Sequence, residues 1–281
     1  MSESDIVQSA VDLSSPIMAT AIHDGHAVRP EIARLLSISD AGRLREEDPF
    51  TGAIARVAGT WVIGKLSRFE VDLNRSREQA VYRAPEEVWG LEIWHETPSQ
   101  RTVESSLANY DSFYESVELL LRRLLDRHER VIVLDLHSYN HRRGGSEEPA
   151  ADPEANPEVN IGTGSMDRVY WSGVVDRFID DLHAGSRRGR DFDVRENVKF
   201  RGGHLCQWIH QMFPRRVCAI AIEFKKCFMD EWTGESDQER INDLALTLRS
   251  TFPGLLESLE NINRATAMAN AEHSWPWLIP H

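Results

Sequence analysis

Residues 131–142 read VIVLDLHSYNHR, and this stretch decides the predicted fold. Its first six residues are apolar except for Asp135, which is typical of a strand in the interior of a protein. The preceding segment, residues 105–128, has apolar residues at helical spacing and ends in basic residues, so it predicts a long helix. A helix followed directly by a buried strand indicates the alternation of an α/β sheet. The apolar run stops at His137, which either caps a core strand or is delivered by that strand to a metal ion.

Further strands and helices extend this alternation along the chain. Short apolar runs predict buried strands at residues 18–22, 159–164 and 216–224. Two strand-like pieces around Gly64 suggest a hairpin or a bulge. Helical patterns predict a short helix opened by Pro30, a helix over residues 172–185, and one or two helices over residues 238–272.

These elements predict one α/β domain over residues 1–281, with a mixed, largely parallel central sheet flanked by helices. Residues 1–15 are expected to be a polar lead-in to the domain. Residues 141–160 are rich in Pro, Gly, Glu and Ala, which predicts a long surface loop. The sequence shows no internal repeat.

The composition is typical of a soluble globular protein, with 41% apolar and 27% charged residues. A formal net charge of −13 argues against nucleic acid or an anionic membrane as a partner, because phosphate binding needs clustered Lys and Arg. No apolar run approaches the roughly 20 residues of a membrane span, and the N-terminus has no secretory signal. We therefore expect a cytoplasmic protein, as a monomer or a small homo-oligomer; the acidity says more about solubility than about the substrate.

The chain has three cysteines, at positions 206, 218 and 227. Their number and spacing match neither a disulfide framework nor a paired zinc motif. We expect them to be reduced and mostly structural.

Polar side chains follow three of the predicted strands at the point where each apolar run ends. His23 follows residues 18–22, His137 follows residues 131–136, and Glu223 ends the last predicted strand. Ligands of α/β sheets bind at the carboxyl ends of the strands, so chemistry is expected where these side chains meet.

The histidines suggest a zinc site. Catalytic zinc typically takes three protein ligands and keeps a fourth position for water. His23 and His26 form a closely spaced pair on a turn that Gly25 allows to fold tightly, and His137 is the natural third ligand. The alternative is that His23 and His26 are a chance pair and that His137 is a capped strand end.

Residues 69–78, FEVDLNRSRE, carry a second group of polar side chains, which we place on a strand end. Taken alone, DLNR is the sequence of a polar turn with a surface salt bridge. As part of a site, Arg75 has a planar guanidinium suited to a substrate carboxylate. Asp72 is suited to accept the second ring N–H of a zinc-bound histidine and so fix its tautomer.

The order of these motifs resembles that of the zinc carboxypeptidase superfamily, and within it more closely the N-formylglutamate amidohydrolase family. The motifs are IHDGHAVRPEI, VDLNR, DLHSY, NIGTG, KFRGGH and AIAIEF, and the resemblance covers roughly residues 17–235. It implies a carboxypeptidase-like fold and one zinc ion, or another divalent ion, held by His23, His26 and His137. His26 stands where the carboxypeptidases usually have a glutamate.

The resemblance also implies roles for residues outside the metal site. Glu223 would activate a water molecule, and Arg75, helped by Asn74, would bind a substrate carboxylate. Gly202 and Gly203 would lie near the substrate, with His204 as an extra contact. The stretch 225–235, KKCFMDEWTGE, has no counterpart that we can place.

The sequence therefore predicts a zinc-dependent amidohydrolase of small N-acylated acidic amino acids, with N-formyl-L-glutamate, cleaved to formate and L-glutamate, as the leading substrate. Arg56 or Arg68 are candidates for stabilising the oxyanion. A zinc carboxypeptidase, another N-acyl-amino-acid amidase, and a non-catalytic binding protein with a vestigial metal site remain open. The sequence contains neither the GxSxG motif of serine hydrolases nor the Gly-rich motifs of nucleotide-binding enzymes.

Overall fold

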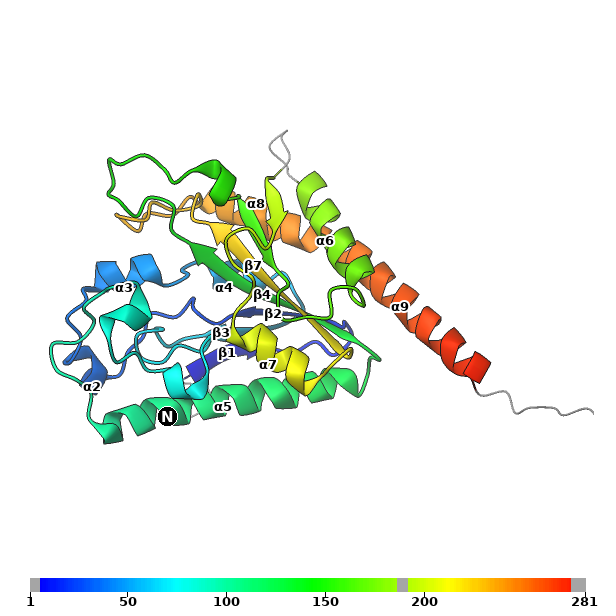
Figure 1. Cartoon of the computed structure of the whole chain (residues 1–281), viewed down its shortest axis with the longest axis horizontal. Helices are drawn as coiled ribbons and strands as arrows, with labels where there is room; N and C mark the ends of the chain where they lie inside the picture. Colours follow the sequence, from blue (N-terminus) through cyan, green and yellow to red (C-terminus); the bar gives the residue numbers. More distant parts are fainter. Residues whose placement is uncertain (1–5, 186–191, 274–281) are drawn as a thin grey trace, which may run out of the picture.

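The computed structural model describes residues 6–185 and 192–273. Its centre is a seven-stranded sheet with the order β1-β3-β2-β4-β7-β5-β6 (Figure 1). The strands are β1 (Val7–Ala10), β2 (Ile17–Ala21), β3 (Thr60–Gly64), β4 (Val131–Tyr139), β5 (Val159–Gly162), β6 (Val194–Glu196) and β7 (Val217–Lys225).

The α-helices and short 3-10 helices lie between and after these strands. The α-helices are α2 (Pro30–Ala33), α3 (Asp40–Glu46), α4 (Thr51–Ala55), α5 (Gln100–Leu125), α6 (Ser172–Ala184), α7 (His204–Met212), α8 (Gln238–Ser250) and α9 (Phe252–His273). The 3-10 helices are η1 (Arg77–Gln79), η2 (Pro85–Val88) and η3 (Pro153–Ala155).

The sheet is mixed and largely parallel, as predicted. Strand β4 lies at its centre and pairs in parallel with both β2 and β7, while β2 pairs in parallel with β3 and β5 with β6. The antiparallel pairs are β1 with β3 and β5 with β7. The carboxyl ends of β2, β4 and β7 therefore meet at one edge of the sheet.

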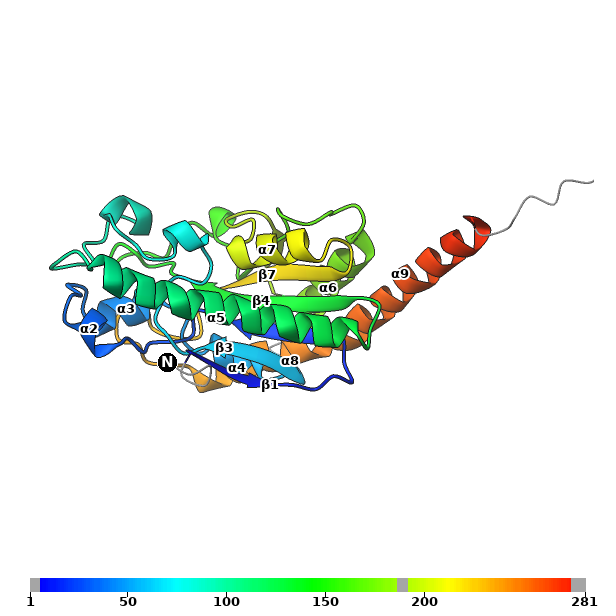
Figure 2. The same cartoon turned by 90° about the horizontal axis from the view of Figure 1, so that it is seen from below.

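Alternation along the central strands divides the core into two layers. In β4, Ile132, Leu134 and Leu136 face the layer covered by α4, α6, α8 and α9. Val131 and Val133 face the opposite layer, which α5 and α7 cover. Figures 1 and 2 show α5 and α7 on one side of the sheet and α6 and α9 on the other, with the end of α9 extending beyond the sheet.

The long helix predicted from residues 105–128 is α5. Ser99 caps its N-terminus by accepting a hydrogen bond from the backbone N–H of Thr102, and basic residues occupy its last turn. Its buried face carries Tyr110 and Tyr114, whose hydroxyls donate to the backbone carbonyls of residues 75 and 73. The helix thus holds the 73–75 segment at the edge of the sheet.

Two sequence predictions about the sheet were wrong. Residues 1–15 are not only a polar lead-in, because Val7–Ala10 pairs with β3 as the edge strand β1. There is no hairpin around Gly64 either: β3 ends there, and residues 65–76 form an irregular segment that touches the 23–27 turn through a bridge between Ala27 and Leu66.

Other predictions are confirmed with small shifts in the bounds. Pro30 opens α2, residues 141–158 form a loop interrupted by η3, and the C-terminal segment forms the two helices α8 and α9.

Within residues 6–185 and 192–273, no helix combines the length and the apolar character that crossing a membrane requires.

The packing of β4 predicts a stability effect. Leu134 is fully buried, so Leu134→Ala should lower the free energy of unfolding by about 3 kcal/mol, measured by chemical denaturation. Leu119 on α5 is 62% exposed, and Leu119→Ala should change the free energy of unfolding by no more than about 0.5 kcal/mol. Equal effects of the two changes would contradict the layering described above.

Candidate metal centre

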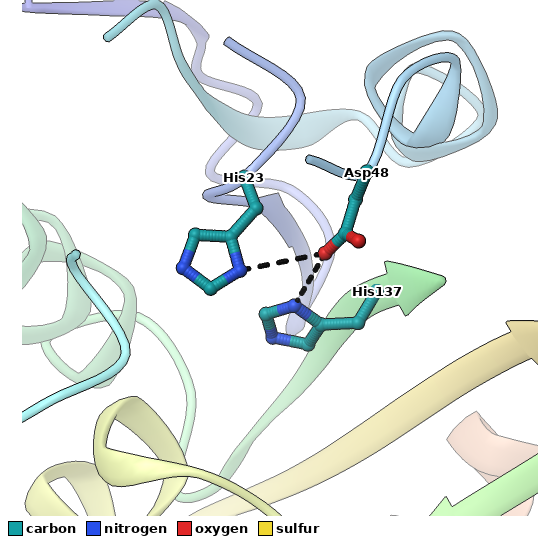
Figure 3. A group of neighbouring side chains, drawn as sticks. All are labelled: His23, Asp48 and His137. Atoms are coloured by element: carbon teal, nitrogen blue, oxygen red, sulfur yellow. Dashed lines mark hydrogen bonds and ion pairs between the residues drawn. The ribbon is translucent and has the colours of Figure 1, made fainter. Parts of the chain in front are cut away.

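Three buried side chains converge at the carboxyl edge of the sheet: His23, Asp48 and His137 (Figure 3). One ligand atom from each lies within 4.8 Å of the others. The Nδ1 atoms of His137 and His23 are 3.0 Å and 3.4 Å from the same carboxylate oxygen, Oδ2 of Asp48. The two imidazole rings meet edge to face, with centroids 5.0 Å apart.

The His23 ring is oriented by Asp72. Its Nε2 donates a hydrogen bond of 2.7 Å to Oδ1 of Asp72, so its Nδ1 carries the lone pair that faces the group. Asp72 is itself fixed by Arg68, whose Nη2 donates to Oδ2 at 2.8 Å, and by the hydroxyl of Tyr82. Burial opposes ionisation of Asp72, yet Arg68 and His23 hold the pKa of this carboxyl well below its usual range. The structure places Asp72 against the second ring nitrogen of His23, and its role toward a zinc-bound histidine stays a prediction.

The His137 ring is oriented by Asp135, the aspartate inside the apolar run of β4. Nε2 of His137 lies 3.1 Å from Oδ2 of Asp135, and Thr20 on β2 donates to the other carboxylate oxygen at 2.6 Å. Burial lowers the pKa of the His137 ring, but Asp135 and Asp48 outweigh burial and raise this pKa well above its ordinary value. The same carboxylates create a negative field that favours a cation between the rings.

Asp48 lies in a buried acidic run, Glu46 to Asp48, which is held from two sides. The backbone N–H of Asp48 donates to the carbonyl of His23, and Oδ1 of Asp48 accepts a hydrogen bond from the Ser138 hydroxyl. The buried ammonium of Lys226, just after β7, donates to the backbone carbonyls of residues 45 and 47. Burial disfavours the Asp48 carboxylate, but its contacts with His137 and His23 hold its pKa far below the usual range. Asp48 is therefore an ionised carboxylate in a fixed position.

These residues fit a divalent metal ion. Two imidazole nitrogens and one carboxylate oxygen form a donor set found in catalytic zinc sites, and each ring has a carboxylate behind it. Nδ1 of His23 is buried and has no hydrogen-bond partner among the described residues, which leaves it available to an ion.

The sequence prediction paired His23 with His26, but the structure does not bring His26 into this group. Nδ1 of His26 contacts Oε2 of Glu47 at 2.5 Å, its Nε2 lies 3.2 Å from Arg43, and the side chain is 40% exposed. Gly25 does not serve to bring the two rings together. A Cβ atom at this position would lie 2.3 Å from the backbone of Lys65, so Gly25 permits the close approach of the 65–66 segment.

Sequence reasoning missed Asp48, and the sequence offered little signal for it. In the sequence, three acidic residues followed by Pro49 are typical of an exposed turn. In the structure a turn does follow, since Phe50 at the start of α4 has φ of 71°. Only the fold shows that Glu47 and Asp48 are buried.

Glu223 lies beside the group on the neighbouring strand. In the parallel pairing of β4 with β7, Glu223 is the register partner of His137. By alternation both residues lie on the same face of the sheet as Val133 and Ala219. Burial raises the pKa of Glu223 to about 7. Both strands continue two residues beyond these side chains, so neither residue is the strand end that the sequence predicted.

Two adjacent pockets lie at this edge of the sheet. The metal pocket, of about 210 Å³, is lined by His23, Asp48, His137 and Glu223. The arginine pocket, of about 790 Å³, is lined by Arg68, Arg75 and Arg201. Five residues line both: Arg68, Asn74, Arg201, Gly202 and Gly203.

The residues predicted to bind substrate line the arginine pocket. The sequence prediction placed Asn74 and Arg75 on a strand end. They lie instead in the irregular segment that α5 holds. Arg75 Nη2 donates to the backbone carbonyl of residue 87, and its guanidinium lies over the Tyr82 ring. Asn74 lies 3.4 Å from Nε2 of His137 and accepts a hydrogen bond from the backbone of residue 205.

The glycines before α7 allow the backbone to approach Asn74. A Cβ at Gly203 would lie 2.1 Å from Nδ2 of Asn74, and Gly202 has φ of +102°. His204 begins α7 and packs edge to face against Tyr114. Glycine at 202 and 203 is therefore a steric requirement of the pocket wall.

The two arginines considered for oxyanion stabilisation lie in different places. Arg68 lines both pockets and lies over the Trp89 ring, which Arg143 also contacts. Arg56 instead lies over Trp61 and donates to Gln8 on β1. Arg68 therefore remains a candidate, whereas the contacts of Arg56 lie on the β1–β3 side of the sheet.

Fold and site together define an α/β protein with a candidate metal centre beside a buried glutamate and an arginine-lined pocket. A family model described as N-formylglutamate amidohydrolase matches residues 15–229, about three quarters of the chain. The chain belongs to this family of hydrolases.

The comparison with solved structures agrees in fold. An N-formylglutamate amidohydrolase from Ralstonia eutropha is 18% identical with a TM-score of 0.68, over 93% of this chain and 99% of that chain. A gene product from Agrobacterium tumefaciens is also 18% identical, with a TM-score of 0.63, over 92% and 97%. No curated protein matches the chain.

The geometry predicts which side chains hold the ion. Asp48→Ala should lose a bound divalent ion that the unmodified chain retains at about one per chain after dialysis, because it removes the anionic ligand. His26→Gln should retain the ion, because its ring contacts Glu47 and Arg43 instead. Elemental analysis of untagged protein distinguishes the two. Loss of the ion in His26→Gln with retention in Asp48→Ala would contradict the ligand set.

Proposed function

We propose that this chain is a metal-dependent amidohydrolase that cleaves the amide of a small N-acylated acidic amino acid, with N-formyl-L-glutamate as the first candidate substrate. The products would be formate and L-glutamate. One observation carries the proposal: Glu223 lies in register with His137, beside the His23–Asp48–His137 group, where that group opens into an arginine-lined pocket. Family membership supports the same reaction class.

We further propose zinc as the ion, held by His23, Asp48 and His137, although other divalent ions suit the same donors. Such an ion supplies Lewis acidity, which polarises a substrate carbonyl and acidifies water. With an ion bound, Asp72 and Asp135 would accept hydrogen bonds from the Nε2–H groups of His23 and His137, which leaves each Nδ1 to face the ion.

Glu223 is proposed as the general base and acid. Its carboxylate would take a proton from the attacking water and deliver that proton to the departing amide nitrogen, so that the amine leaves neutral. Arg68, fixed by Asp72 at the junction of the two pockets, would stabilise the negative charge that develops on the carbonyl oxygen.

The arginine pocket fits an acidic amino acid. Arg75 and Arg201 line it, and a planar guanidinium binds a carboxylate through two parallel hydrogen bonds. Several other arginines have partners outside this pocket: Arg77 pairs with Asp111, Arg215 with Asp167, and Arg216 donates to the backbone carbonyl of residue 129. A chain of net charge −13 thus places several of its arginines at one pocket.

A second candidate substrate class follows from the size of this pocket. At about 790 Å³ it falls in the range of about 300–1,000 Å³ typical of sites for drug-sized ligands. Since this pocket is proposed to hold the amino acid, N-acyl derivatives of amino acids larger than glutamate would also fit, and a panel of N-formyl derivatives of glutamate and of larger amino acids distinguishes the two classes by kcat/KM.

Glu223→Gln tests the proposed base. The amide keeps the shape but cannot accept a proton, so kcat on N-formyl-L-glutamate should fall about 10²–10⁴-fold while the bound ion is retained. The exposed Glu96→Gln is the matched control and should change kcat less than about twofold. Turnover by Glu223→Gln at the control rate would remove Glu223 from this role.

Arg75→Gln tests the proposed carboxylate contact. It should raise KM for N-formyl-L-glutamate about tenfold or more with a smaller change in kcat, because it removes an interaction made before the reaction. Arg77→Gln is the control, since Arg77 is two residues away and pairs with Asp111 on α5. An unchanged KM for Arg75→Gln would exclude Arg75 as the anchor.

A further inference from the structure

A second cluster of titratable side chains, Cys227, His141 and Glu231, lies near the candidate metal centre. Two of them, Cys227 and Glu231, belong to residues 225–235, the stretch for which the family resemblance gives no counterpart. Cys227 follows β7, and its Sγ lies 4.0 Å from Nε2 of His141, which follows β4. The other ring nitrogen, Nδ1 of His141, lies 2.7 Å from Oε1 of Glu231. The imidazole of His141 thus lies between the thiol of Cys227 and the carboxylate of Glu231.

The sheet itself places these residues together. His137 and Glu223 are register partners on β4 and β7, and His141 and Cys227 each follow four residues later. The backbone remains paired beyond the strands, because the N–H of Lys226 donates to the carbonyl of Tyr139. The cluster is therefore fixed by the same strand pairing as the metal centre.

Glu231 is held rigidly against the histidine. It is 4% exposed, and its carboxylate accepts hydrogen bonds from the backbone N–H groups of His141 and Arg142, at 2.5 Å and 3.1 Å. The Nδ1 contact has the distance of an ion pair without the alignment of a hydrogen bond. Contacts with Cys227 and Glu231 raise the pKa of His141 to about 9, so the ring is cationic at neutral pH.

The cluster opens into a cavity of about 480 Å³, separate from the arginine pocket. Among the charged groups that face it, three are basic and three acidic besides Glu231: Arg142, Lys226, Arg240, Asp230, Glu235 and Asp237. The His141 ring contacts the sulfur directly, at 4.0 Å. Cys206 and Cys218 are buried, whereas Cys227 is partly exposed.

We propose that Cys227, His141 and Glu231 form a thiol-modification site that exchanges with low-molecular-weight disulfides. A cationic imidazole beside a cysteine favours the thiolate, which is the nucleophile in such exchange. The thiolate attacks one sulfur of the small disulfide, a bond forms between Sγ and that sulfur, and the original S–S bond breaks. The departing thiolate takes the electron pair and is then protonated by His141 or solvent. The site does not depend on the amidohydrolase activity.

The test is the reaction of the full-length chain with glutathione disulfide, followed by intact-mass and peptide mass spectrometry. Native protein should acquire one adduct at Cys227, with none at Cys206 or Cys218. At pH 6, native Cys227 should react at least about tenfold faster than it does in the urea-unfolded chain. Reaction at Cys206 or Cys218, or a native rate no greater than the unfolded rate, overturns the proposal.

A pair of histidine variants isolates the role of the ring. His141→Gln should slow the pH 6 reaction about tenfold or more, while His95→Gln, an exposed histidine on another segment, should leave the rate unchanged. An unchanged rate in folded His141→Gln overturns the proposal. If that variant does not fold, the comparison of native and unfolded chain decides alone.

Discussion

Two buried carboxylates behind two imidazoles are the constraint on which the rest of the site depends. Asp72 binds Nε2 of His23, and Asp135 binds Nε2 of His137. Each pair fixes the plane of a ring and the nitrogen that faces inward. With the rings oriented in this way, one candidate ligand atom each of His23, Asp48 and His137 lies within 4.8 Å of the others.

The carboxylates are tolerated in the core because the surrounding structure compensates their charge. Asp72 has Arg68 and Tyr82, while Asp135 has Thr20 in addition to the histidine. An isolated buried carboxylate would lose several kcal/mol of hydration, so each needs these partners to remain ionised. Three buried carboxylates thus lie around two imidazoles, and the His23–Asp48–His137 donors fit a divalent ion.

Parallel strand pairing explains why chemistry from distant parts of the sequence meets here. Strands β2, β4 and β7 lie side by side with their carboxyl ends at one edge, so His23, His137 and Glu223 are brought together by register. The same pairing continues past the strands and sets Cys227 beside His141. The same strand pairing therefore contributes residues to both the candidate metal centre and the thiol cluster.

The sequence alone predicts the fold class and the positions of the polar residues that follow or end the buried strands. Apolar runs predict β2, β4 and β7, and the polar residue after each run pointed to His23, His137 and Glu223. It was insufficient where position depends on irregular backbone. Asp48 and residues 72–75 lie in such segments, held by Lys226 and by tyrosines of α5, and no local pattern encodes those distant contacts. His26 lies near His23 in the sequence, but its ring contacts Glu47 instead.

Anomalous X-ray scattering at the zinc edge, from crystals of the zinc-loaded full chain, tests the central claim most directly. The expected result is a single strong peak at about 2.0–2.2 Å from Nδ1 of His23, Nδ1 of His137 and a carboxylate oxygen of Asp48. A peak coordinated by His26, or the absence of a peak between the two rings, would contradict it.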